Sequence, residues 1–159
     1  AQATDRVSQL IIADMSPVDY QPSHTKIFEG LTAIDKADIQ SRKQADELLS
    51  QYESSLPIRQ FLLKNLERSE QGFKLSIALD NIANSYQTIL KKPEISKAIN
   101  TPTLFIKGEK SDYIIADYQQ AIMTLFPNAS FKMIPNTGHW LHAEKPAPFA
   151  SLVRRFLSK

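Results

Sequence analysis

The spacing of hydrophobic residues changes several times along the chain, and each spacing predicts a different element. Short apolar runs occur at 7–13 (VSQLIIA), 103–107 (TLFIK) and 130–134 (SFKMI), each bounded on at least one side by aspartate, asparagine or proline. Such runs are typical of strands, and continuous apolar runs are typical of strands that are buried on both faces of a parallel sheet. The pattern therefore predicts three buried strands.

Apolar residues at helical spacing fill most of the remainder. They predict helices over 40–52, 57–66, 81–90, 116–126 and 146–157. Pro57 and Pro146 suit the first turn of a helix, and Asp80 suits the N-cap of the third one. A turn at 69–72 is expected to open a short extended piece over 73–77. The order is one strand, then about 80 largely helical residues, then strand–helix–strand–helix.

This order predicts an α/β protein whose sheet is incomplete within the 159 residues, because sheets usually have about 4–6 strands. We expect the other strands upstream of Ala1, where the chain starts without Met. Only 4 of the 159 residues are glycine, which fits glycine-rich turns lying in that upstream part. We expect 1–19 to form a core strand and its loop, 20–99 a helical cap inserted over the carboxyl ends of the strands, and 100–159 the last core strands and helices.

The composition excludes several classes of function. The chain has no cysteine, which excludes disulfides, thiolate metal sites and a cysteine nucleophile. No apolar stretch approaches about 18 residues, so we expect no membrane span. The net charge of +2 is too small to indicate nucleic-acid binding. Residues 81–159 carry 10 basic and 5 acidic groups, which fits either a solvated surface or an anionic substrate.

Among the three histidines, His139 has the most informative surroundings. It follows the predicted strand 130–134, and Gly138 before it permits a positive φ. A histidine at the carboxyl end of a strand can act as a general base, and Trp140 could form a wall of such a site. The alternative is a buried histidine with its hydrogen bonds satisfied. We expect His24 to be an exposed loop residue without a role.

Two aspartates that follow predicted strands could orient His139. Asp14 ends the first strand, and Asp112 lies five residues beyond the second. Either could accept the N–H of the imidazole and so fix its tautomer. The alternatives are a turn at Asp14 and a helix cap or surface loop at Asp112.

The sequence predicts neither a metal site nor a nucleophile motif. His139, His142 and Glu144 are a ligand set that zinc accepts, but their spacing departs from H-E-x-x-H and Pro146 stops a helix through the segment. We expect no metal or other cofactor, and expect His142 and Glu144 to hold the loop by hydrogen bonds. The glycines are too isolated for a G-x-S-x-G nucleophile motif or a phosphate-binding loop.

Three segments carry a resemblance to a known family. The stretches 103–113 (TLFIKGEKSDY) and 126–146 (FPNASFKMIPNTGHWLHAEKP) resemble the end of an α/β-hydrolase. The stretch 10–20 (LIIADMSPVDY) resembles the corresponding strand of small bacterial esterases of the YbfF type. Together with 60–64 (QFLLK), the resemblance covers essentially the whole chain, but it matches only the C-terminal three-fifths or so of such an enzyme.

The resemblance implies a serine esterase or thioesterase with a catalytic triad. His139 matches the histidine that takes and returns the proton of the nucleophile. Most α/β-hydrolases would point to Asp112 (or Glu109) as the acid, whereas the YbfF-type esterases point to Asp14, which we prefer because that match is closer.

Further residues and segments follow from the same resemblance. Ser111 and Tyr113 match a stretch that shapes the pocket, so with Trp140 they are expected to bind substrate. The nucleophile serine and the oxyanion hole belong to a segment absent here, and a missing N-terminal segment or a partner chain is expected to complete the sheet. The chain alone should therefore be inactive.

The expected substrate is a short- to medium-chain acyl ester or thioester, and we expect a cytoplasmic protein. Two alternatives stay open. One is a non-catalytic module that binds a ligand or partner, and the other is a dehalogenase or C–C hydrolase of the same fold.

Overall fold

The computed structural model describes residues 6–158, which divide into two compact units. One unit is formed by the segments up to Asp19 and from Lys92 onward, and the other by Tyr20–Lys91. Ile95 and Ile99, which lie in the segment expected to form the cap, pack in the core of the first unit.

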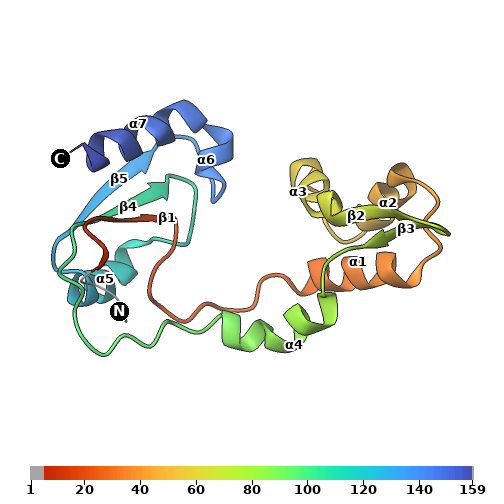
Figure 1. Ribbon diagram of the computed structural model, residues 1–159, viewed down its shortest axis with the longest axis horizontal. Coiled ribbons are helices and arrows are strands. Elements are labelled where there is room, and N and C mark those ends of the chain that lie inside the picture. Colours follow the sequence, from red (N-terminus) through yellow and green to blue (C-terminus); the bar gives the residue numbers. More distant parts are fainter. Residues whose placement is uncertain (1–5, 159) are drawn as a thin grey trace. The chain divides into compact units, whose positions relative to one another are not determined.

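The first unit is built on a three-stranded parallel sheet in the order β1-β4-β5 (Figure 1). The strands are β1 (Leu10–Ala13), β4 (Thr103–Gly108) and β5 (Ala129–Ile134). All three predicted strands are present, although β1 begins at Leu10 rather than at Val7. The central strand β4 is buried along nearly its whole length, as a continuous apolar run predicts.

Helices cover both faces of this sheet, and Figure 1 shows α5 and α7 on opposite sides of it. The elements are η3 (Ala116–Tyr118), α5 (Gln119–Leu125), α6 (Leu141–Glu144) and α7 (Pro146–Leu157). The helix predicted at 146–157 coincides with α7, while the one predicted at 116–126 is divided into η3 and α5. The one-turn helix α6 forms just before Pro146, where no helix was expected.

Alternate side chains of β4 pack in two separate hydrophobic cores, one on each face of the sheet. Phe105 packs with Ile122 and Phe126 on the α5 side, and its ring lies 5.4 Å from that of Phe131. Leu104 and Ile106 pack on the α7 side. Because strand side chains alternate between faces, one strand anchors both helical layers.

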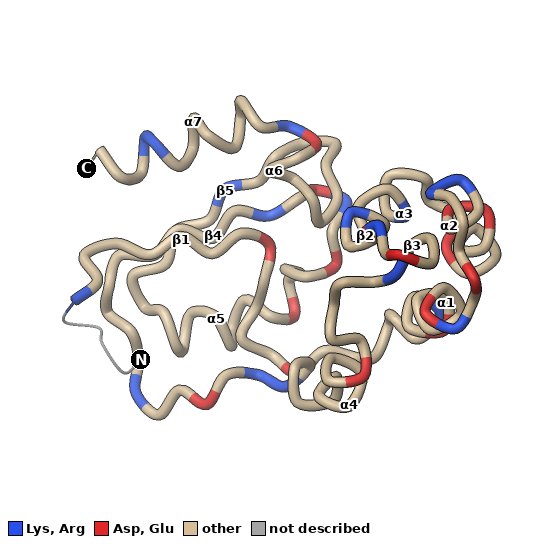
Figure 2. Tube along the Cα trace, turned by 45° about the vertical axis from the view of Figure 1, so that its right-hand side comes forward, with Lys and Arg blue, Asp and Glu red and all other residues tan. Residues whose placement is uncertain are grey.

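The second unit is mostly helical, as predicted. Its elements are α1 (Thr25–Lys36), α2 (Arg42–Leu49), α3 (Leu56–Leu62), η2 (Leu63–Asn65), β2 (Leu66–Ser69), β3 (Gly72–Leu75) and α4 (Leu79–Ile89). Its core is made of aliphatic residues from α1, α2 and the β2–β3 hairpin. Figure 2 shows both signs of charge interspersed along α1 and α2.

Two predictions for this unit are wrong in detail. The predicted helix 57–66 ends early, because Leu66 pairs with Leu75 in the hairpin and is fully buried there. An apolar residue at position 66 fits a helix stripe and a strand equally well, and the hairpin decides. Asp80 lies in the first turn of α4 rather than at its N-cap, which is Ala78.

Within residues 6–158, no helix has the length and hydrophobicity that a bilayer span requires.

Candidate active site

Asp14 lies at the carboxyl edge of the sheet, directly after strand β1. Asp14 follows the last residue of β1, and its backbone N–H donates to the Ile106 carbonyl of β4 at 2.8 Å. Its φ of +50° lies in the left-handed region, which aspartate enters more readily than most residues. The side chain is only 1% exposed, so its carboxylate must find hydrogen-bond donors within the protein.

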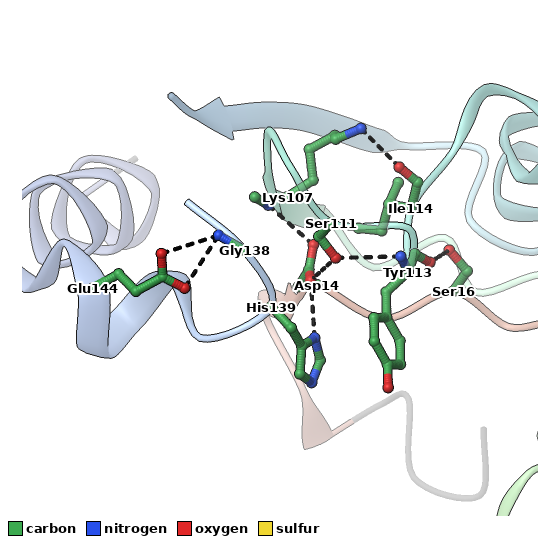
Figure 3. Close-up of polar contacts among 10 residues, drawn as sticks. Asp14, Ser16, Lys107, Ser111, Tyr113, Ile114, Gly138, His139 and Glu144 are labelled. Atoms are coloured by element: carbon green, nitrogen blue, oxygen red, sulfur yellow. Dashed lines mark hydrogen bonds and ion pairs between the residues drawn. The ribbon is translucent and has the colours of Figure 1, made fainter. Parts of the chain in front are cut away.

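Three donors from the other two strand ends meet this carboxylate (Figure 3). The backbone N–H of Gly108 donates to Oδ1 at 3.0 Å, and the Ser111 hydroxyl donates to Oδ2. Nδ1 of His139 lies 2.9 Å from the same Oδ2. The loops after β4 and β5 therefore converge on the residue that ends β1.

The imidazole of His139 is fixed in both tautomer and orientation. Since a carboxylate only accepts hydrogen bonds, Nδ1 carries the proton that it donates to Asp14, and Nε2 of the neutral ring keeps a free lone pair. The ring of Tyr113 stacks on it at 4.0 Å and 22° (Figure 3). The His139 side chain is 39% exposed. An oriented ring with a free nitrogen lone pair, on a side chain that is partly exposed, is what a general base requires.

The other residues that the sequence predicted for the site differ in their burial and in their contacts with Asp14 and His139. Of the two candidate acids, Asp14 contacts His139, while Asp112 is exposed in the loop after β4. Ser111 is buried against the Asp14 carboxylate, and its oxygen also accepts the Tyr113 N–H at 3.3 Å. Trp140 is half-buried at the N-terminus of α6.

The loop that carries His139 contacts the loop after β4 closely. A Cβ on Gly108 would lie 2.1 Å from the Gly138 carbonyl oxygen, so only glycine fits there. The Asn136 N–H donates to the Glu109 carboxylate at 2.7 Å, and the Lys110 N–H donates to the Thr137 carbonyl at 2.9 Å. These contacts fix the path of the loop between the end of β5 and His139.

The two other residues of the zinc-like set lie on α6. Both carboxylate oxygens of Glu144 accept the Gly138 N–H at 3.1 Å, so Glu144 holds the loop as expected. His142 is exposed, with its ring 6.1 Å from that of Phe149. Across residues 6–158, no group of three histidine, aspartate or glutamate side chains is arranged to hold a metal ion.

His24 differs from the expectation of an exposed loop residue. It is half-buried at the N-cap of α1, with Nδ1 2.7 Å from the Tyr86 hydroxyl of α4. It thus links two helices of the second unit.

Comparisons with known proteins find relatives along nearly the whole chain, although no protein-family model matches it. The chain is 35% identical to "Esterase YbfF" of Escherichia coli over 99% of its own length and 61% of that protein. It is 36% identical to the "sn-1-specific diacylglycerol lipase ABHD11" of Mus musculus over 99% of its own length and 53% of that protein. A solved "Marine microorganism esterase" superimposes with a TM-score of 0.90 at 38% identity, over 96% of this chain and 61% of that one.

The chain has the fold of the C-terminal part of an α/β-hydrolase. The similarity to YbfF-type esterases that the sequence indicated is confirmed along nearly the whole chain. The chain spans about half to three-fifths of the length of these relatives. The sequence does not predict the contact of Ser111 with Asp14, because no local signal distinguishes a serine that faces a carboxylate from one that lines a pocket.

Proposed function

We propose that this chain supplies the general base and the orienting acid of a serine-type carboxylic ester hydrolase. The observation that carries the proposal is the bond from His139 Nδ1 to the buried carboxylate of Asp14, at 2.9 Å. That bond leaves Nε2 to act on a hydroxyl group. The similarity to proteins named esterase and diacylglycerol lipase supports the same class of reaction.

The proposed chemistry is acyl transfer through a serine. His139 Nε2 takes the serine hydroxyl proton as the oxygen attacks the ester carbonyl, and the resulting imidazolium gives that proton to the departing alcohol or thiol. A water molecule then repeats the sequence on the acyl-enzyme. Asp14 keeps the ring in the reactive tautomer and stabilises the imidazolium, and the Ser111 hydroxyl fixes the carboxylate.

The nucleophile is proposed to lie outside these 159 residues. None of the four glycines forms the G-x-S-x-G motif. Among the described residues, β1 pairs with β4 and has no strand on its other edge, so another strand can pair there. We call the chain joined to this nucleophile-bearing segment the completed enzyme. The chain without that segment should be inactive.

The proposed substrates are short- to medium-chain acyl esters or thioesters. The second unit, Tyr20–Lys91, is proposed to act as the cap that receives the acyl group. Trp140 and Tyr113 are proposed to contact the substrate, since both lie beside His139 in the chain or in space.

Hydrolysis of p-nitrophenyl acyl esters by the completed enzyme tests the proposal. His139→Ala should lower kcat at least about 10³-fold, because it removes the general base. Asp14→Asn should lower it strongly, whereas Asp112→Asn should stay near wild type. A loss below about tenfold in His139→Ala, or equal small effects of the two asparagine variants, would contradict the assignment.

The coding sequence separates the proposal from its alternatives. A strand–G-x-S-x-G–helix segment upstream of Ala1 supports the esterase. Its absence supports a binding module, and an aspartate in place of that serine supports a dehalogenase.

A further inference from the structure

One peptide unit in the loop after β5 is held at both ends. The carbonyl oxygen of Thr137 accepts the Lys110 N–H at 2.9 Å, and the N–H of Gly138, on the same peptide, donates to the Glu144 carboxylate. The residue that follows this peptide is His139. The orientation of the peptide therefore sets where the His139 backbone begins.

Glu144 reaches the peptide from a short, well-anchored helix. Leu141, the first residue of α6, is fully buried in the core beneath α7. The N–H groups of Ala143 and Glu144 both donate to the Trp140 carbonyl at 2.8 Å, which closes the turn. Figure 3 shows the Glu144 carboxylate pointing at the Gly138 nitrogen from α6. Because α6 is anchored to the core, the hydrogen bond from Gly138 to Glu144 restricts the movement of the loop before His139.

We propose that Glu144 is a positioning residue for the general base: its hydrogen bond to the Gly138 N–H holds His139 where the imidazole meets Asp14. The inference rests on the proposed function, in which His139 is that base. Glu144 itself does not touch the reacting atoms and acts only through the backbone before His139.

The geometry separates this role from a general contribution to folding. Glu144 is exposed, and water can replace its carboxylate at the Gly138 N–H, so its removal leaves no buried group without a partner. The Lys110 bond then holds only one end of the peptide, and the loop gains freedom next to His139. A displacement of about 1 Å in a catalytic group can lower a rate about 10²-fold.

The test compares three variants of the completed enzyme. Glu144→Ala should lower kcat about 10- to 100-fold, with KM within about threefold of wild type. Glu144→Gln keeps an oxygen that accepts the Gly138 N–H and should restore kcat to within about threefold of wild type. Glu94→Ala removes an exposed carboxylate elsewhere in the same unit and serves as the matched control. All three should unfold within about 4 °C of wild type.

A second readout does not depend on activity. In a proton NMR spectrum of the completed enzyme, the His139 Nδ1–H bonded to Asp14 should give a low-field signal. That signal should shift or broaden in Glu144→Ala and stay in place in Glu144→Gln.

Three results would overturn the inference. These are a kcat of Glu144→Ala within twofold of wild type, a loss as large in Glu144→Gln as in Glu144→Ala, and a loss confined to KM. If His139→Ala leaves hydrolysis unchanged, the proposed function fails instead. The NMR signal then decides alone, and an unchanged Nδ1–H in Glu144→Ala overturns the role of Glu144.

Discussion

Replacing Gly108 with alanine tests whether the close contact of two loops holds His139 against Asp14. Gly108 ends β4, and a Cβ there would lie 2.1 Å from the carbonyl oxygen of Gly138 and 2.8 Å from that of Thr137. Both atoms belong to the backbone, so neither can rotate away as the end of a side chain can. One of the two loops has to move.

The size of the movement follows from the contact distances. Real Cβ atoms essentially never approach another atom closer than 3.0 Å, so the loops must separate by at least 3.0 − 2.1 = 0.9 Å. His139 directly follows Gly138, and its bond to Asp14 is 2.9 Å long. We expect Gly108→Ala to lower kcat about 10²-fold through this displacement. We also expect it to destabilise the fold by about 1–3 kcal/mol, as overpacking usually does.

Two measurements on the completed enzyme check this expectation: kcat for p-nitrophenyl ester hydrolysis and the midpoint of thermal unfolding. Gly72→Ala is the matched control, because its Cβ would lie 2.4 Å from the Ile39 carbonyl at a φ of +115°. That variant should unfold at a lower temperature, yet its folded fraction should keep kcat near wild type. A Gly108→Ala enzyme with full activity and an unchanged midpoint would refute the reasoning.

Three further predictions concern single contacts. Ser111→Ala removes a donor from the buried carboxylate of Asp14, and we expect kcat in the ester assay to fall about tenfold or more, with Ser111→Thr retaining most activity. Asn136 has a φ of +56°, so Asn136→Val should lower the free energy of unfolding by about 1–2 kcal/mol while Asn136→Gly should not, as urea titration can measure. Phe105 is fully buried, and Phe105→Ala should cost about 3–5 kcal/mol in the same titration.

The helix 146–157 illustrates what periodicity can predict. Its apolar residues form one stripe that packs against a single face of the sheet, so local spacing and tertiary packing agree. The hairpin β2–β3 illustrates the opposite case. Leu66 fits a helix stripe, and only its pairing with Leu75, nine positions along the chain, makes it a strand residue. Such pairing has no signal in the spacing around Leu66 itself.

For the site, the sequence could predict which residues end the strands but not how they meet. His139, Asp14 and Asp112 all qualified, because each follows a strand that the apolar runs predict. The contact between Ser111 and Asp14 could not be predicted from the sequence, since it depends on the path of the loop after β4.

The contact between Asp14 and His139 follows from the order of the strands. Strands lie about 4.8 Å apart, so β1 and β5, which flank β4, are about 10 Å apart. Asp14 and His139 must therefore meet over the end of β4, where a side chain at position 108 would clash with the carbonyl oxygens of Gly138 and Thr137 in the loop before His139. Gly108 ends β4 without one, and its N–H also donates to Asp14. A glycine that ends the central strand is thus the sequence feature that lets Asp14, after β1, approach His139, whereas Asp112 lies beyond that glycine in an exposed loop.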